Sequence, residues 1–423
     1  MLVYQQSVFL GLKDLPVASR IARIEKVLKE NAETLLETLN QKRLGFGAMR
    51  RDKDLVPAGP FLDLLKHTFR EHSPFDDPKS QFGPNGWQLL GDRLAKVQTF
   101  STFRDHAFFW SLIEAEGAFL EDFLPFCSHE ERATGALLNS MIMSARSYSS
   151  LCSLGGTGKV GPAIYFYDTS TDCNEKHTGA DVGLIVRSGE ASNPLIKVAR
   201  LQVKISEQSG TRPRRFLVGL TNKSEQAPTK GFPRNHENFV QLRTLADTPQ
   251  LGYYLLINEK GEGGDNVVQP CLIAPAMAVS YAIAQSLGTP PKVTPLVDLS
   301  EKINPIPLFA FLGIAMTSRG SGYGVELPQG TDRSDALERA ETILFGKDAQ
   351  KPRYRLIVDT TADPLKLNLV SKGVPGKPAL ADIEPIWEVP SMALDATPPS
   401  RSAPDTDLNQ EQHNSGSGGI RIR

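Results

Sequence analysis

Two short segments of the chain hold residue types that together could bind a metal ion and act on a phosphodiester. Asp181 opens a run of apolar and β-branched residues at 181–187. Gln202 and Lys204, with one residue between them, lie near the end of a second such run at 197–205. Runs of this composition, bounded by loop-forming residues, are typical of β-strands. We therefore expect a carboxylate, an amide and an ammonium to be carried by two neighbouring strands.

The connection between these runs, at 188–196, contains Gly, Ser, Asn and Pro and suits a hairpin of antiparallel strands. A hairpin centred near residue 192 or 193 places Asp181 opposite Lys204, with Gln202 on the diagonal. Because side chains alternate along a strand, Gln202 and Lys204 share one face. Val203, between them, then points into the core.

These groups suit a hard divalent cation, Mg²⁺ or Mn²⁺, which takes oxygen ligands and keeps several waters. The ligands expected from the sequence are Asp181, the amide oxygen of Gln202 and the backbone carbonyl of Val203. Glu175, six residues before Asp181, could add a second carboxylate from the preceding loop. Such an ion polarises a phosphodiester and lowers the pKa of a bound water. Lys204 would stabilise the negative charge of the transition state or orient the attacking water.

The combined pattern resembles the PD-(D/E)XK phosphodiesterase superfamily, which has the restriction-endonuclease-like fold, and in particular its Q-x-K branch. The resemblance rests on Glu175, on Thr178-Gly-Ala-Asp181, on Gln202-Val-Lys204 and on the following strand at 253–258. It covers roughly residues 162–285.

The resemblance implies an αβββαβ core and Mg²⁺-dependent cleavage of nucleic acid, usually DNA. It gives Asp181 and Gln202 the role of metal ligands and Lys204 that of catalytic lysine. It also implies help from Glu175, since Gln202 replaces the commoner acid. Nuclease domains with an unfamiliar helical extension further resemble effectors of bacterial antiphage defence, which implies a defence role.

A basic stretch accompanies the proposed site. Ten basic residues and three acids lie between Lys197 and Arg243, which favours contact with phosphates, although a solvated charged surface gives the same pattern. The candidate nucleic-acid-binding residues are Arg200, Arg212, Arg214, Arg215, Lys230, Arg234, Gln241 and Arg243.

Hydrophobic periodicity and Gly- or Pro-rich stretches divide the chain into five segments of a mixed α/β and α+β protein. We expect a helical N-terminal domain at 1–153, a Gly-rich linker at 154–161, the nuclease-like core at 162–290, an α/β extension at 291–388 and a disordered tail at 389–423. The helical patterns that matter most lie at 87–123, 129–151, 237–245, 274–286 and 334–345, and the strand patterns at 163–167, 181–187, 197–205, 253–258 and 354–359.

Composition limits the class of protein. The chain has 423 residues and a formal net charge of -1, which argues against a uniformly basic nucleic-acid coat. Its four cysteines form no C-x-x-C pair, its start lacks the features of a secretory signal, and its longest apolar run, 308–316, is too short to span a bilayer. These features favour a cytoplasmic protein without a membrane partner.

Other motifs fail on inspection. The Gly-Gly-Thr-Gly-Lys stretch at 155–159 lacks the first Gly and the final Ser or Thr of a phosphate loop, and the segment at 129–133 lacks the second His of a zinc-protease helix. The favoured function is thus a nuclease with a protein partner or homo-oligomer contact through its helical domain. Two alternatives stay open: a non-catalytic, nuclease-derived scaffold that binds nucleic acid or protein, and a small-molecule enzyme that uses 308–324.

Overall fold

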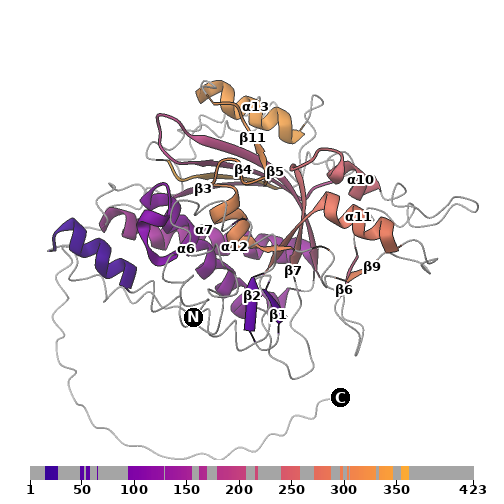
Figure 1. The fold of residues 1–423 in the computed structure, drawn as a ribbon, viewed down its shortest axis with the longest axis horizontal. Coiled ribbons are helices and arrows are strands. Elements are labelled where there is room, and N and C mark those ends of the chain that lie inside the picture. The colour runs from indigo at the N-terminus through magenta and orange to yellow at the C-terminus, as the bar shows by residue number, and fades with distance from the viewer. Residues whose placement is uncertain are drawn as a thin grey trace, which may run out of the picture.

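The protein is built on one large mixed sheet (Figure 1). The computed structural model describes residues 15–26, 48–51, 54–57, 64, 94–127, 129–154, 162–168, 179–205, 215–217, 240–257, 271–286, 296–298, 303, 305–329, 333–345 and 354–361. Its helices and strands confirm the mixed α/β class expected from the sequence.

The main sheet has eight strands, seven of them in the order β10-β8-β7-β5-β4-β12-β3, and the eighth, β11, pairs with Lys197 and Val198 of β5, before the part of β5 that pairs with β7. Strands β4 and β5 are antiparallel, whereas β5 runs parallel to β7 and β4 runs parallel to β12. The strands are β3 (Ala163–Asp168), β4 (Val182–Ser188), β5 (Leu195–Ile205), β7 (Gly252–Ile257), β8 (Leu272–Pro275), β10 (Ile306–Pro307), β11 (Val325–Glu326) and β12 (Tyr354–Asp359).

Helices cover both faces of this sheet. One face packs against α6 (Phe103–Ala118), α7 (Glu130–Leu154), α12 (Leu308–Ala310) and the π-helical turn η6 (Phe311–Ala315). The other face packs against α13 (Arg333–Phe345) in one cluster and against α10 (Val240–Ala246) and α11 (Ala276–Ser286) in another. Figure 1 shows α6 and α7 on one side of the sheet and α13 on the other. Because both faces of the sheet are covered, β4 and β7 are buried along their full length and are mainly apolar, with Arg187 and Ser188 as buried polar residues at the end of β4.

The helices before the sheet have identifiable starts. Thr102 caps α6, since its Oγ1 accepts a hydrogen bond of 3.1 Å from the backbone N–H of Asp105. The helix α7 begins with two acids, Glu130 and Glu131, whose charge suits a helix N-terminus. The predicted helix at 129–151 is confirmed. The one at 87–123, whose pattern is interrupted near Gly117, is divided within its described part into η2 (Val97–Thr99), α6, which ends at Ala118, and η3 (Phe119–Phe123), and η4 (Leu124–Phe126) follows.

Two small sheets lie outside the main one. Strands β1 (Ala48–Arg51) and β2 (Asp54–Pro57) form an antiparallel hairpin, and β6 (Arg215–Leu217) pairs with β9 (Leu296–Asp298). The hairpin was not expected within the mostly helical segment 1–153, because helical periodicity does not register pairing between two short adjacent strands.

Segments far apart in sequence complete one layer. Strand β12, from the region predicted as a C-terminal extension, lies between β3 and β4 of the predicted core, and α6 and α7 share the main hydrophobic cluster with the same sheet. The domain boundaries themselves stay a prediction. No helix among the described residues is long and apolar enough to cross a membrane.

Candidate active site

Asp181 lies at the point where β4 begins, and its backbone is held from both sides. Its N–H donates to the carbonyl of Leu201 on β5 at 2.9 Å, and its carbonyl accepts from the N–H of Tyr354 on β12 at 2.7 Å. A residue tied to two neighbouring strands has little freedom to move. The carboxylate is therefore presented from a rigid part of the sheet.

One oxygen of that carboxylate receives two N–H donors from β5. Asp181 Oδ2 accepts from the side-chain Nε2 of Gln202 at 2.5 Å and from the backbone N–H of Val203 at 2.8 Å. Hydrogen bonds to a charged acceptor are stronger than neutral ones, so these contacts fix the carboxylate against the strand. Two of the residues predicted for one site are thus in direct contact.

The carboxamide of Gln202 is buried and only half satisfied. The residue is 1% exposed, and its Oε1 has no hydrogen-bond partner among the described residues. A buried acceptor left without a donor costs about 1–3 kcal/mol. The amide thus has an oxygen that is not used in a hydrogen bond to any described residue, and it neighbours an aspartate. An amide oxygen and a carboxylate are ligands that suit a cation.

The register of the hairpin differs from the expected one. Ser188 pairs with Leu195 and Val182 with Leu201, so Asp181 is level with Gln202 rather than with Lys204. The turn is tighter than predicted: Gly189 adopts a left-handed φ of 81° directly after β4. The expectation that Lys204 lies opposite Asp181 was wrong, because the loop composition did not determine where the turn is centred.

Lys204 instead meets an acid from a different element. Its Nζ lies 3.2 Å from Oε2 of Glu130, in the first turn of α7, with side-chain exposures of 11% and 40%. Sequence reasoning missed Glu130 as a site residue, because an acid in the first turn of a helix is explained by the helix dipole alone. The signal that could have found it is its position in the helix that directly precedes the first strand of the predicted core.

Some of the remaining predicted ligand and nucleic-acid-binding residues lie among the described residues, and others do not. Val203 belongs to the main core, as expected, and its carbonyl lies 3.4 Å from Gln202 Nε2. Arg215 is the first residue of β6, and Gln241 and Arg243 lie in α10 on either side of buried Leu242. Glu175, Arg212, Arg214, Lys230 and Arg234 lie outside the described residues.

Arg200 is used inside the protein. Its guanidinium donates from Nε to the carbonyl of Leu344 at 2.8 Å and from Nη2 to that of Ile343 at 3.1 Å. These carbonyls belong to the last turn of α13, where a helix has unpaired acceptors and favours positive charge. Arg200 is therefore left out of the nucleic-acid surface that the sequence suggested.

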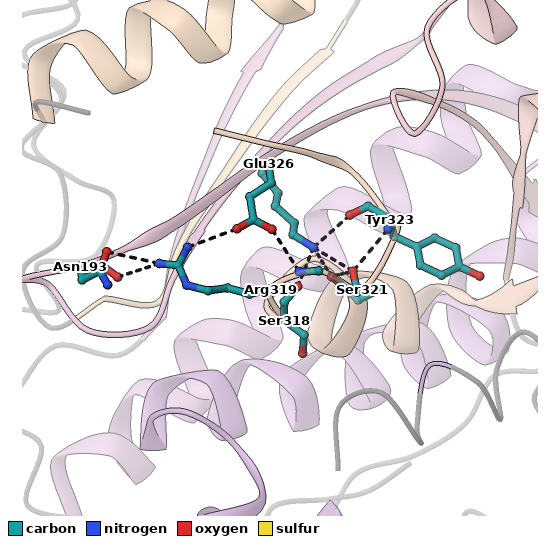
Figure 2. Close-up of polar contacts among 9 residues, drawn as sticks. Asn193, Ser318, Arg319, Ser321, Tyr323 and Glu326 are labelled. Atoms are coloured by element: carbon teal, nitrogen blue, oxygen red, sulfur yellow. Dashed lines mark hydrogen bonds and ion pairs between the residues drawn. The ribbon is translucent and has the colours of Figure 1, made fainter. Parts of the chain in front are cut away.

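A second lysine of β5, Lys197, lies in a different environment, and Figure 2 shows Ser318, Ser321 and Tyr323 of the segment around it. Lys197 is 1% exposed, and its Nζ lies within 3.1 Å of four oxygens of the segment 315–323, which share its three N–H donors. The acceptors are the carbonyls of Ala315, Ser318 and Tyr323 and the hydroxyl of Ser321. Burial lowers the pKa of Lys197 to about 8. The segment that we considered for a small-molecule site is thus closed around an internal lysine.

The donor set near Asp181 permits a metal ion without providing a cluster of acids. Among the described residues, no group of three or more His, Cys, Asp or Glu side chains is arranged to hold one. Asp181 supplies one oxygen, and Gln202 Oε1 would supply a second if the carboxamide, whose Nε2 now faces Asp181, were turned over; two such ligands fit the few protein ligands that Mg²⁺ usually takes.

Comparison with known proteins adds no assignment: no protein-family model, no curated protein and no solved structure matches this chain.

Proposed function

We propose that the chain is a metal-dependent nuclease that cleaves phosphodiester bonds of nucleic acid, with DNA as the first substrate to test. One observation carries the proposal: Asp181, Gln202 and Lys204 are gathered at one end of the β4–β5 pair, with Glu130 on the lysine. A carboxylate, an amide oxygen and a lysine are the groups expected for metal-assisted hydrolysis of a phosphodiester.

The order of elements supports the finer fold assignment. Helix α7, strands β3, β4 and β5, helix α10 and strand β7 occur in the αβββαβ order implied by the resemblance to PD-(D/E)XK enzymes, with the short strand β6, which belongs to a separate small sheet, inserted between β5 and α10. The parallel pairing of β5 with β7 through α10 agrees with that assignment. One departure is the insertion of β12 between β3 and β4.

In the proposed reaction, Asp181 and Gln202 hold the ion, which supplies Lewis-acid chemistry and a more acidic bound water when present. Asp181 stays in place because β5 and β12 hold its backbone. Glu130 neutralises Lys204 while no substrate is bound. When a phosphate arrives, Lys204 shifts from that carboxylate to the phosphate oxygens and stabilises the charge that grows on them.

The test is a cleavage assay with the full chain on duplex DNA, single-stranded DNA and RNA, each with Mg²⁺, with Mn²⁺ or with EDTA. We expect cleavage that needs the ion and that Asp181→Ala abolishes. The matched control is Asp247→Ala, which removes an exposed acid after α10 and should cleave like wild type. Equal cleavage by wild type and Asp181→Ala would rule out the site.

The same assay addresses the alternative function. The chain could leave all three nucleic acids uncut with either ion and still bind one of these nucleic acids in a fluorescence-anisotropy titration. In that case the protein is the non-catalytic scaffold. The role in antiphage defence stays a prediction from the resemblance.

A further inference from the structure

The orientation of the Gln202 carboxamide is unusual for a residue expected to give its oxygen to a cation. Its Nε2, not its Oε1, is directed at Asp181 Oδ2, and the same Nε2 lies 3.4 Å from the carbonyl of Val203. Both neighbours are acceptors, so the nitrogen is correctly placed there. The opposite orientation would put oxygen against oxygen.

The other half of the amide is in the reverse situation. Oε1 is buried in a residue that is 1% exposed, and it has no donor among the described residues. The amide is thus satisfied on the side of Asp181 and unsatisfied on its far side. The last torsion of a glutamine side chain is soft and roughly two-fold, so the two orientations differ by a rotation of about 180°.

We propose that Gln202 is an amide switch whose orientation is coupled to cation binding at Asp181. This inference rests on the proposed function. Without the ion, the Gln202 N–H occupies the space at Asp181 Oδ2 where a positive charge would act. With the ion, the carboxamide turns over, Oε1 faces the cation and the N–H leaves the carboxylate. Asp181 keeps the backbone N–H of Val203 as a donor in both states.

The switch gives Gln202 a role that an acid cannot have. A glutamate at this position has no N–H to donate, so it would leave Asp181 permanently open and add a second negative charge to the ligand set. A glutamine instead makes the ion compete with an internal hydrogen bond. The chain would thereby bind its ion more weakly and release it more readily.

The decisive variants are Gln202→Glu and Gln202→Met in the full chain, with Mn²⁺ as the paramagnetic probe for binding. Because ligand charge tunes affinity for hard cations over decades, we expect Mn²⁺ to bind Gln202→Glu about tenfold more tightly than wild type. Gln202→Met keeps the size but has neither donor nor oxygen, and should bind about tenfold more weakly. Equal affinities in all three proteins would overturn the switch.

A second measurement reads the amide directly and does not depend on activity. The glutamine carboxamides are isotopically labelled and observed by NMR, and the Gln202 pair is identified as the signals missing from Gln202→Met. We expect this pair to shift and to lose protection from hydrogen exchange as diamagnetic Mg²⁺ saturates the site. Signals that stay unchanged at saturation contradict the switch.

The failures are distinguishable. If Asp181→Ala loses Mn²⁺ binding while the Gln202 signals do not respond to Mg²⁺, the metal site stands and the switch is wrong. If wild type binds no Mn²⁺, or binds it as well as Asp181→Ala does, the metal site fails and the switch with it.

Discussion

Strand β5 carries a lysine toward each end, and the two have opposite surroundings. Lys197 is enclosed by four neutral oxygens of one loop, three of them backbone carbonyls. Lys204 meets a carboxylate, Glu130, whose side chain is 40% exposed. The two residues have the same chemistry and the same strand, but their partners differ in charge and in access to solvent.

The difference separates structural from chemical use of a lysine. Lys197 supplies the N–H donors for carbonyls at the end of η6 and in the following loop. That loop also contains Gly324, which has a left-handed φ of 71°. Nothing in that arrangement can be exchanged for a substrate without opening the loop. Among the described residues, Lys204 has one ionic partner, Glu130, and a phosphate can replace a carboxylate with little loss. We therefore expect substitutions at the two lysines to act on different quantities.

The largest effect should follow from Lys204→Met. Loss of a charge that stabilises the transition state should reduce the rate of cleavage about 10²–10³-fold. The unfolding free energy should change by less than about 1 kcal/mol, since the ion pair with Glu130 is partly exposed. Single-turnover cleavage and urea denaturation measure the two quantities. Arg339→Met, which removes an exposed charge from α13, is the control, and equal rates in both variants would refute the role of Lys204.

The converse is expected for Lys197→Met. Buried carbonyls of Ala315, Ser318 and Tyr323 lose their shared donor, which should lower the unfolding free energy by about 2 kcal/mol. Mn²⁺ affinity of the folded protein should equal that of wild type. A loss of Mn²⁺ binding without a loss of stability would show that the two ends of β5 are not independent.

The pH dependence of stability should distinguish the lysines as well. Burial lowers the pKa of folded Lys197 to about 8, whereas its ordinary value is 10.5. Between these values the unfolded chain binds more protons than the folded one, so the unfolding free energy gains from Lys197 as pH rises through about 8 toward 10.5. The difference between wild type and Lys197→Met should therefore grow over this range. Urea denaturation at pH 7.5, 9 and 10 measures it, and a constant difference would contradict the shift.

Much of this arrangement could be predicted from local sequence, but the contacts that define the site could not. The strands β4, β5 and β7 are recognisable because both faces of the sheet are covered, so that most of their residues are apolar or β-branched even though β5 also carries polar side chains. The helix α7 is recognisable from its acidic start. Composition and spacing also predicted that Asp181 and Gln202 lie near each other on neighbouring strands.

Tertiary partners carry no local signal. Strand β12 pairs with β4 although more than 150 residues separate them, and this insertion is invisible in either segment alone. The contact of Glu130 with Lys204 depends on how α7 lies against the sheet. The two-residue register error arose in the same way, because loop composition suggests a hairpin without locating its turn. Arg200 looked like a phosphate ligand only because its acceptors on α13 are remote in sequence.

Arg200→Ala should have the smallest effect and tests the comparison at the middle of β5. Its guanidinium closes the last turn of α13 through the carbonyls of Ile343 and Leu344, and loss of such a cap costs about 1 kcal/mol. We expect a drop of this size in urea denaturation and wild-type rates of cleavage. Arg200→Lys should recover only part of the loss, because an ammonium cannot span two carbonyls with the planar fork of a guanidinium. A cleavage defect at unchanged stability would instead indicate that Arg200 contacts nucleic acid. The functional part of β5 would then begin at Arg200 rather than at Gln202.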